Sequence, residues 1–134
     1  MRIDHAKAGI LVVANVTCVA LAVTITGCSG EPPVPVGDAI GRTLAEVMAF
    51  ASDDAGFLIQ DSSPRVGRAA SFSLGTSDAR EWTVVAICAD AADLHDADAV
   101  EVAVIPSETY ADVEEQVDVG EFRDLVTCDG LAYR

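Results

Sequence analysis

After Cys28 the sequence contains no lysine, and aromatic residues make up only 5% of the whole chain. Residues 28–134 hold six arginines against 21 aspartates and glutamates. Nucleic acids and anionic lipid headgroups attract basic proteins, so this excess of acidic residues argues against both as electrostatic partners. We therefore expect no nucleic-acid partner, and any membrane attachment has to hold without help from charge.

Signatures of catalysis are also missing. His95 is the only histidine after Cys28, and the sequence contains no GxSxG, Walker or HExxH motif. Paired carboxylates are a further route to acid–base chemistry, but each neighbouring acidic pair here fits a solvated surface equally well. We expect a protein that is not an enzyme and needs no cofactor.

The first 28 residues have the three parts of a secretory signal. A basic start is followed by residues 8–25, which are uncharged and mostly apolar, and then by the small residues Thr26 and Gly27. A transmembrane helix is the competing interpretation. It needs about 20 apolar residues, and this stretch carries Asn15 and two threonines, which are costly in hydrocarbon.

Ile25, Thr26, Gly27 and Cys28 follow one another at the end of this stretch and resemble the lipobox of bacterial lipoproteins. In that family the cysteine thiol receives a diacylglycerol, and the signal is cut just before it. The resemblance implies that residues 1–27 are a signal peptide and that Cys28 is lipidated, with the remainder on the outer face of the cytoplasmic membrane. An uncleaved N-terminal anchor is the alternative, and it gives the same extracytoplasmic location.

Two cysteines remain once Cys18 leaves with the signal peptide and Cys28 carries lipid. An even pair in an oxidising compartment predicts a disulfide between Cys88 and Cys128. A metal site or a reactive thiol is the alternative, but no other cysteine or histidine lies at ligand spacing from either residue. Removing 27 of the 134 residues leaves 107, which is enough for one small domain.

The chain after Cys28 begins with a spacer. Residues 28–37 contain three prolines within four positions, which favour an extended, semi-rigid tether. A helix is then expected over residues 44–55, because Thr43 and Glu46 have the spacing of a capping box and apolar residues recur at helical intervals. Gly56 suits the position just past the end of that helix.

Three strands are expected from short runs of aromatic and β-branched residues, over residues 57–59, 81–88 and 100–105. The last two predict an antiparallel hairpin with a long acidic loop. Residues 107–134 form an acidic C-terminal tail with a weak helical pattern, whose order depends on Cys128 reaching Cys88.

This order of elements resembles the PASTA domain, a small module found outside bacterial cells in penicillin-binding proteins and Ser/Thr kinases. The matching residues are Val36, Gly41, Thr43, Leu44, Ala55–Phe57, Trp82–Val85 and Val100–Ile105. The Gln-x-Pro segment and the Pro-Gly turn of the family are absent after the tryptophan strand. The resemblance implies an α+β domain over residues 38–106, with one α-helix packed on a small, mainly antiparallel three-stranded sheet. It also implies binding of peptidoglycan fragments or protein partners.

Two groups of residues are candidates for ligand binding. Trp82 can offer a stacking surface or pack in the core. Arg65, Arg68 and Arg80 lie in the loops around it and can bind a carboxylate ligand, such as a peptide stem, or pair with the protein's own acids. The acidic loop offers oxygen ligands for calcium, but its spacing fits no EF-hand, and a solvated loop is the alternative. The acids concerned are Asp90, Asp93, Asp96 and Asp98.

The lipobox resemblance makes a direct prediction about the native protein. Mass spectrometry of material extracted from membranes should find a chain that begins at Cys28 and carries a diacylglycerol on its sulfur. A Cys28→Ser variant should keep residues 1–27, because the signal is cut only in front of the lipidated cysteine. An unmodified Cys28 in the wild-type protein, with the first 27 residues still attached, would contradict the prediction.

Overall fold

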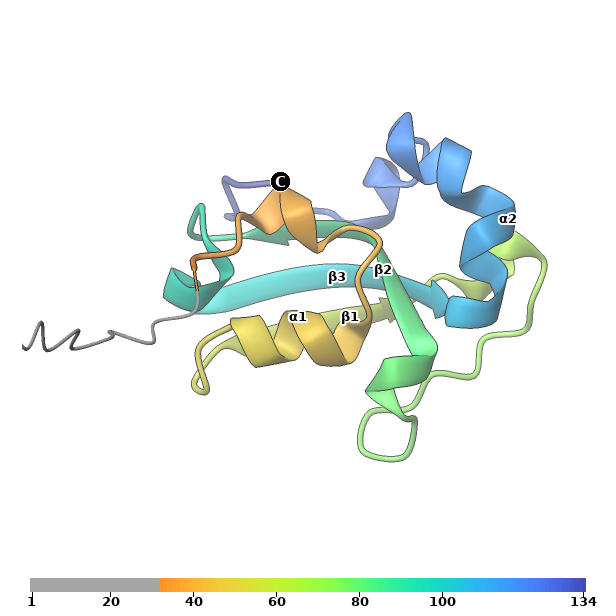
Figure 1. Ribbon diagram of the computed structural model, residues 1–134, viewed down its shortest axis with the longest axis horizontal. Coiled ribbons are helices and arrows are strands. Elements are labelled where there is room, and N and C mark those ends of the chain that lie inside the picture. Colours follow the sequence, from red (N-terminus) through yellow and green to blue (C-terminus); the bar gives the residue numbers. More distant parts are fainter. Residues whose placement is uncertain (1–31) are drawn as a thin grey trace, which may run out of the picture. The chain divides into compact units, whose positions relative to one another are not determined.

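The computed structural model describes residues 32–134. Residues 1–31, including the signal peptide and the lipidation site predicted at Cys28, lie outside the described residues. The described part contains three strands and two α-helices (Figure 1). These are α1 (Leu44–Phe50), β1 (Gly56–Asp61), β2 (Trp82–Ala89), β3 (Ala99–Pro106) and α2 (Ser107–Asp118), with short 3-10 helices η1 (Val36–Ala39), η2 (Ser63–Val66), η3 (Ala79–Glu81), η4 (Leu94–Asp96) and η5 (Arg123–Leu125).

The three strands form one sheet in the order β1-β3-β2, so β3 lies in the middle. β2 and β3 pair antiparallel, which confirms the predicted hairpin. β1 pairs with β3 in parallel, because the chain crosses the end of the sheet after β1 and starts β2 on the far side of β3. The α+β class is therefore confirmed, whereas the sheet is mixed and not mainly antiparallel.

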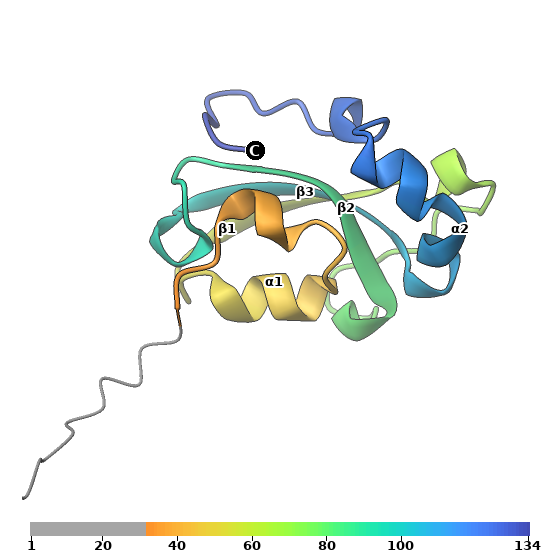
Figure 2. The ribbon, with the colours of Figure 1, turned by 45° about the horizontal axis from the view of Figure 1, so that its top comes forward.

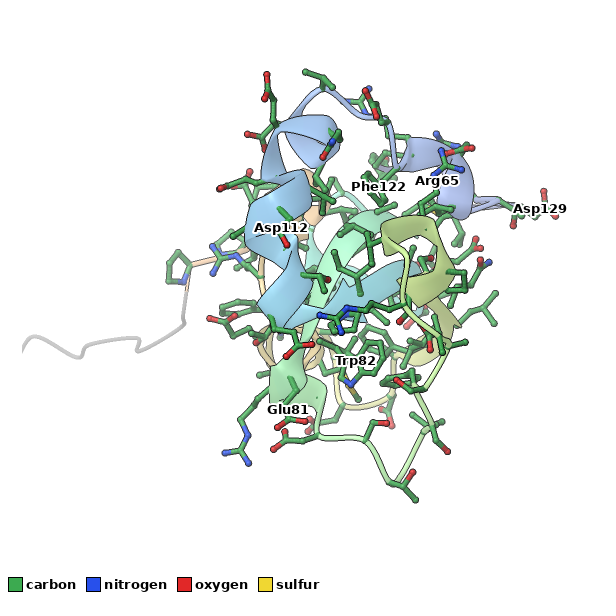
Figure 3. All side chains as sticks on the ribbon, turned by 90° about the vertical axis from the view of Figure 1, so that its right-hand side faces the viewer. Arg65, Glu81, Trp82, Asp112, Phe122 and Asp129 are labelled. Atoms are coloured by element: carbon green, nitrogen blue, oxygen red, sulfur yellow. A yellow bond between two sulfur atoms is a disulfide. The ribbon has the colours of Figure 1, made fainter. Side chains whose placement is uncertain are left out.

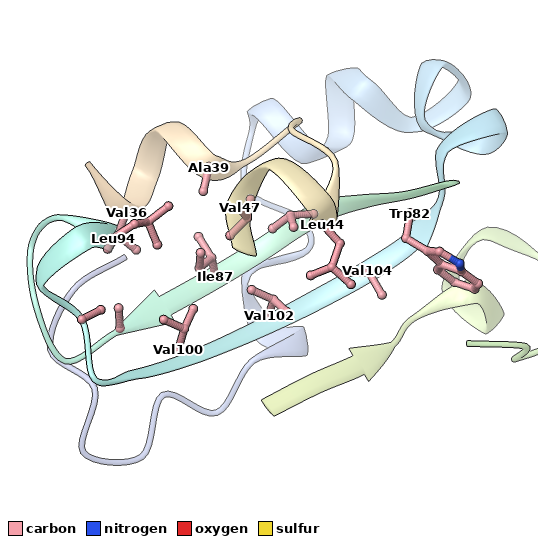
Figure 4. Packing of buried hydrophobic residues seen from close by; sticks show 13 residues of the cluster. Val36, Ala39, Leu44, Val47, Trp82, Ile87, Leu94, Val100, Val102 and Val104 are labelled. Atoms are coloured by element: carbon pink, nitrogen blue, oxygen red, sulfur yellow. The ribbon is translucent and has the colours of Figure 1, made fainter. Parts of the chain in front are cut away.

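One face of the sheet is covered by η1 and α1. Val100, Val102 and Val104 of β3 point to this face and are fully buried beneath Leu44 and Val47 of α1 (Figure 4). The alternation of side chains along a strand places every second residue on the same face, which is why three valines at this spacing form a continuous apolar surface. This cluster is the larger part of the core.

The other face is covered by the C-terminal part of the chain. Ala103 and Ile105 of β3 are buried against a cluster that also contains Val117, Phe122 and Val126. In Figure 2 the C-terminal segment and α1 lie on opposite sides of the strands. Residues 107–134, which the sequence predicts to be an acidic tail, thus supply a second helix and half of the sheet's cover.

The first helix is shorter than predicted. Its N-terminus has the predicted capping box: Glu46 N–H donates to Thr43 Oγ1 over 3.3 Å, and Thr43 N–H donates to Glu46 Oε2 over 2.8 Å. The helix ends at Phe50 and not at residue 55. Asp53 and Asp54 explain the difference, since negative charges oppose the partial negative charge at a helix C-terminus.

The predicted proline-rich tether is joined to the fold at its C-terminal end. Val36 N–H donates to the carbonyl of Ala92 over 2.9 Å, and Leu94 N–H donates to the carbonyl of Val34 over 2.9 Å. Val36 and Leu94 are both fully buried. The structure therefore fixes the chain against the β2–β3 loop from Val34 onward.

Neither α1 nor α2, nor any other helix within residues 32–134, combines the length and apolarity needed to cross a bilayer.

Candidate functional site

A disulfide joins the central sheet to the C-terminal segment. Cys88 of β2 and Cys128 form the bond, with their Cα atoms 5.7 Å apart, which confirms the predicted pairing. Cys88 is fully buried, and it lies beside Glu101 of β3, its partner in the strand register. One Glu101 carboxylate oxygen is 3.8 Å from the Cys88 sulfur. The Cys88–Cys128 disulfide and the buried Glu101 carboxylate therefore lie side by side.

Glu101 is a carboxylate only 3% exposed, and it is held by neutral donors. It accepts hydrogen bonds from the backbone N–H groups of Thr127 at 3.0 Å and Cys128 at 2.8 Å, and from Gln60 Nε2 at 3.0 Å. Burial alone raises the pKa of Glu101, but the bonds from Thr127, Cys128 and Gln60 outweigh it, so the pKa lies below its ordinary value of 4.5. The carboxylate is thus charged at neutral pH and ties β1 and the C-terminal segment to β3.

The two disulfide cysteines and Glu101 are also the only group of three potential metal ligands found within residues 32–134. Cys88, Glu101 and Cys128 bring three ligand atoms within 4.8 Å of one another. Both sulfurs are used in the disulfide, however, and Glu101 already accepts several hydrogen bonds. The cluster therefore has a structural role, because it joins the sheet to the C-terminal segment. We call these three residues the Glu101 latch.

The acidic loop is packed and internally bonded. Asp90 accepts hydrogen bonds from the N–H groups of Asp98 at 3.0 Å and Ala99 at 3.1 Å, while Leu94 and Ala97 are buried. The four acids predicted as calcium ligands are not gathered into a cluster of three within residues 32–134. Calcium binding by Asp90, Asp93, Asp96 and Asp98 stays a prediction without geometric support.

The surface around Trp82 contains few groups that are free to bind a carboxylate. Trp82 is 5% exposed, with its ring edge-to-face against Phe72 at a centroid distance of 5.1 Å, and Figure 3 shows it among other side chains. The three arginines predicted around it each pair with an acid of the chain. The pairs are Arg80–Asp78 at 2.8 Å, Arg68–Glu108 at 3.2 Å and Arg65–Asp124 at 3.8 Å.

A cavity of about 530 Å³ lies beside Trp82. Glu81 and Glu108 line it together with Arg80. Two carboxylates against one arginine, itself paired with Asp78, make this cavity a poor receptor for an anionic ligand. Ligand binding by Trp82, Arg65, Arg68 and Arg80 remains a prediction. The remaining arginines of the described chain are not in these ion pairs and are better candidates.

The other three arginines of the described chain lie together. Arg42, Arg123 and Arg134 take part in none of the ion pairs formed within residues 32–134. Arg123 and Arg134 line one cavity of about 300 Å³ that contains no acidic residue, which we call the arginine pocket. Its lining is Gly37, Ile40, Ala86, Ile87, Arg123, Val126 and Arg134.

Four parts of the chain build the arginine pocket. Gly37 and Ile40 line it from η1 and its C-cap, and Ala86 and Ile87 line it from the edge strand β2. Arg123 begins η5 after a turn at Gly120. The Arg123 side chain lies against Gly120, because a Cβ atom placed on Gly120 would be only 2.7 Å from Arg123 Nε. Arg134 follows Tyr133, which exchanges backbone hydrogen bonds of 2.9 and 3.1 Å with Ala89.

A second cavity, of about 450 Å³, adjoins the arginine pocket and shares Gly37, Ile40 and Arg123 with it. Arg42 lines this cavity, with its Cζ 5.1 Å from the centre of the Phe50 ring and its Nε donating to the carbonyl of Asp38 over 2.9 Å. Asp38 and Asp118 also line it. The positive charge is therefore concentrated at the first cavity, where apolar groups and two guanidinium groups can receive a carboxylate.

Sequence reasoning did not find the arginine pocket. Arg123 and Arg134 lie in the segment predicted to be a tail, and nothing in their spacing connects them to Ile40 or to β2. One signal was present in the sequence, namely that arginine is scarce after Cys28.

Comparison of the chain with protein-family models, with curated proteins and with solved structures finds no match.

The Glu101 latch predicts how stability depends on pH. Because its folded pKa is depressed, Glu101 contributes stability that is fully present above pH 4.5 and is lost as pH falls through the folded pKa. Glu101→Gln should lower the free energy of unfolding at pH 7 by about 1–3 kcal/mol, since an amide cannot accept from all the donors. It should also flatten the acid limb of the stability profile.

The matched control is Glu115→Gln, which removes an exposed carboxylate on α2. Urea unfolding of both variants between pH 3 and pH 7 provides the measurement. An unchanged stability and an unchanged acid limb in Glu101→Gln, equal to those of the control, would contradict the latch.

Proposed function

We propose that the protein is a lipid-anchored, extracytoplasmic binding module of the bacterial cell envelope, which holds a carboxylate-bearing ligand in the arginine pocket. The ligand class we favour is the peptide stem of peptidoglycan. The module carries out no catalysis in this proposal. Its role is to hold cell-wall material near the membrane to which Cys28 attaches it.

The single observation that carries the binding role is the placement of the arginines. A strongly acidic chain can neutralise its cations with its own carboxylates, as it does at Arg65, Arg68 and Arg80. Arg123 and Arg134 instead line a cavity whose other lining residues within 32–134 are glycine or apolar. Guanidinium groups bind carboxylates through two parallel hydrogen bonds, and apolar walls strengthen such bonds by excluding water.

Two further observations support the location. Residues 25–28 have the form of a lipobox, and the Cys88–Cys128 disulfide is a bond that persists in oxidising compartments outside the cytoplasm. The resemblance to the PASTA domain supports the cell wall as a binding partner, because that family acts outside bacterial cells.

An accessory lipoprotein that modulates an envelope protein complex is the second candidate. The net charge of −14 favours it, because a large acidic surface attracts a basic protein partner and not a polyanion. Crosslinking in cells separates the two candidates, since the accessory role predicts a protein adduct without glycan.

The binding proposal is tested with soluble muropeptides that carry stem peptides with free carboxylates. Calorimetric titration should show saturable binding to the wild-type protein. Arg123→Gln and Arg134→Gln should each weaken binding by roughly tenfold or more, because each removes a charge-assisted hydrogen bond to the carboxylate.

Arg80→Gln is the matched control, since Arg80 is exposed and already paired with Asp78. Binding that survives both pocket substitutions but is lost in Arg80→Gln would move the site to the surface around Trp82. Wild-type protein that does not bind muropeptides at all would contradict the peptidoglycan proposal.

A further inference from the structure

The two edges of the sheet differ in whether other segments of the chain bond to their outward backbone groups. On the β2 edge, Val84 accepts a hydrogen bond from Gly41 N–H and donates one to the carbonyl of Arg42, both 2.9 Å long. Near the other end of the same edge, Ala89 exchanges two backbone hydrogen bonds with Tyr133. The β2 edge is therefore closed at both ends by the chain itself.

The β1 edge is open. Gly56 N–H donates to the carbonyl of Asp98, and Ser62 N–H donates to the carbonyl of Val104, so even-numbered residues of β1 turn their N–H groups towards β3. Successive residues of a strand face opposite sides, which turns the N–H and C=O groups of Phe57 and Ile59 outward. Within residues 32–134 no backbone or side-chain hydrogen bond reaches these outward groups.

Before its last residue, Asp61, β1 also lacks the side-chain features by which proteins usually protect such an edge. Lysines, prolines, bulges and inward-pointing charges serve this purpose elsewhere, but residues 56–60 have the sequence Gly-Phe-Leu-Ile-Gln. Leu58 is 59% exposed in the middle of the strand. The loop after β1 is drawn across its C-terminal end, where Asp61 accepts hydrogen bonds from Ser71 N–H at 2.6 Å and Phe72 N–H at 2.7 Å. Figure 4 shows β1 at the margin of the sheet.

A shallow groove of about 470 Å³ runs beside this edge, on the face covered by the C-terminal segment. Leu58 and Leu131 line it, together with Glu101, Thr127 and the exposed Asp129. Side chains of a strand added next to β1 would point alternately into this groove and away from it. The groove therefore selects an apolar side chain at every second position of such a strand.

The charge around the edge is negative. Asp53 and Asp54 precede β1, Asp98 lies next to its first residue, and Asp129 is in the groove, and all four are exposed. None of them forms an ion pair within residues 32–134. A second copy of this chain, with its net charge of −14, would be repelled here, whereas a basic segment would be attracted.

The geometry points to the outer edge of β1 as a docking site for an extended segment of a partner protein, which adds to the sheet as a fourth strand. The segment has apolar residues at alternate positions and lysine or arginine on its flanks. Backbone hydrogen bonds to Phe57 and Ile59 give the affinity, and the groove at Leu58 with its surrounding aspartates gives the specificity. This surface is separate from the arginine pocket and does not depend on the ligand proposed for it.

The probe for this site is a synthetic peptide of alternating valine and threonine flanked by paired lysines. The full-length protein in detergent micelles is titrated with it while amide hydrogen exchange is followed by NMR. Without peptide, the amides of Phe57 and Ile59 should exchange quickly and those of Leu58 and Gln60 slowly. Saturating peptide should slow exchange at Phe57 and Ile59 by at least about tenfold.

Leu58→Lys should weaken peptide binding by about tenfold, because it removes an apolar contact and adds a like charge. Leu58→Thr keeps strand propensity and should weaken binding by only about threefold. Val119→Lys places the same charge on another exposed apolar residue, just after α2, and should leave binding unchanged.

Three results would overturn the proposal. The first is fast exchange at Phe57 and Ile59 in the presence of saturating peptide. The second is equal binding of a peptide flanked by glutamates. The third is protection of both amides by raising the protein concentration alone, with a dimer in sedimentation, which would make a second copy the occupant.

Discussion

The buried carboxylate of Glu101 is the constraint on which the rest of the structure depends. Its charge lies in the interior and is paired with no cation of residues 32–134, and the cost of burying it is offset by donors from β1 and from the C-terminal segment. Because two of these donors are the backbone N–H groups of Thr127 and Cys128, the charge is stabilised only when that segment is in place. The disulfide from Cys88 holds the segment at the same point.

This arrangement connects stability to the proposed function. The C-terminal segment covers the second face of the sheet through Phe122 and Val126, and it also carries Arg123 and Arg134 into the arginine pocket. A small domain has little core to spare, so the residues that complete the core also position the binding groups. The β1 edge also depends on the latch, because Gln60 of β1 donates to Glu101, and Glu101 and Leu131 both line the groove beside that edge.

Much of the fold could be predicted from local patterns in the sequence. The cap at Thr43 and the strands around Val84 and Val102 follow from spacing and residue type. The cysteine pair follows once the lipobox resemblance accounts for the other two cysteines. The parallel pairing of β1 could not, because it depends on the path of a long connection. The role of residues 107–134 was also missed, since their apolar side chains are sparse among acids and their burial depends on β3 presenting a second apolar face. The arginine pocket is assembled from segments far apart in the chain, so no local motif marks it.

The central claim is that the C-terminal segment and the sheet form one cooperative unit held by Glu101. Native-state hydrogen exchange of the amides of Thr127 and Cys128 tests it most directly. The account predicts that both amides open with the same free energy as the central amides of β3, which exchange only on global unfolding. Exchange of Thr127 and Cys128 through a local opening several kcal/mol below that of β3 would contradict it.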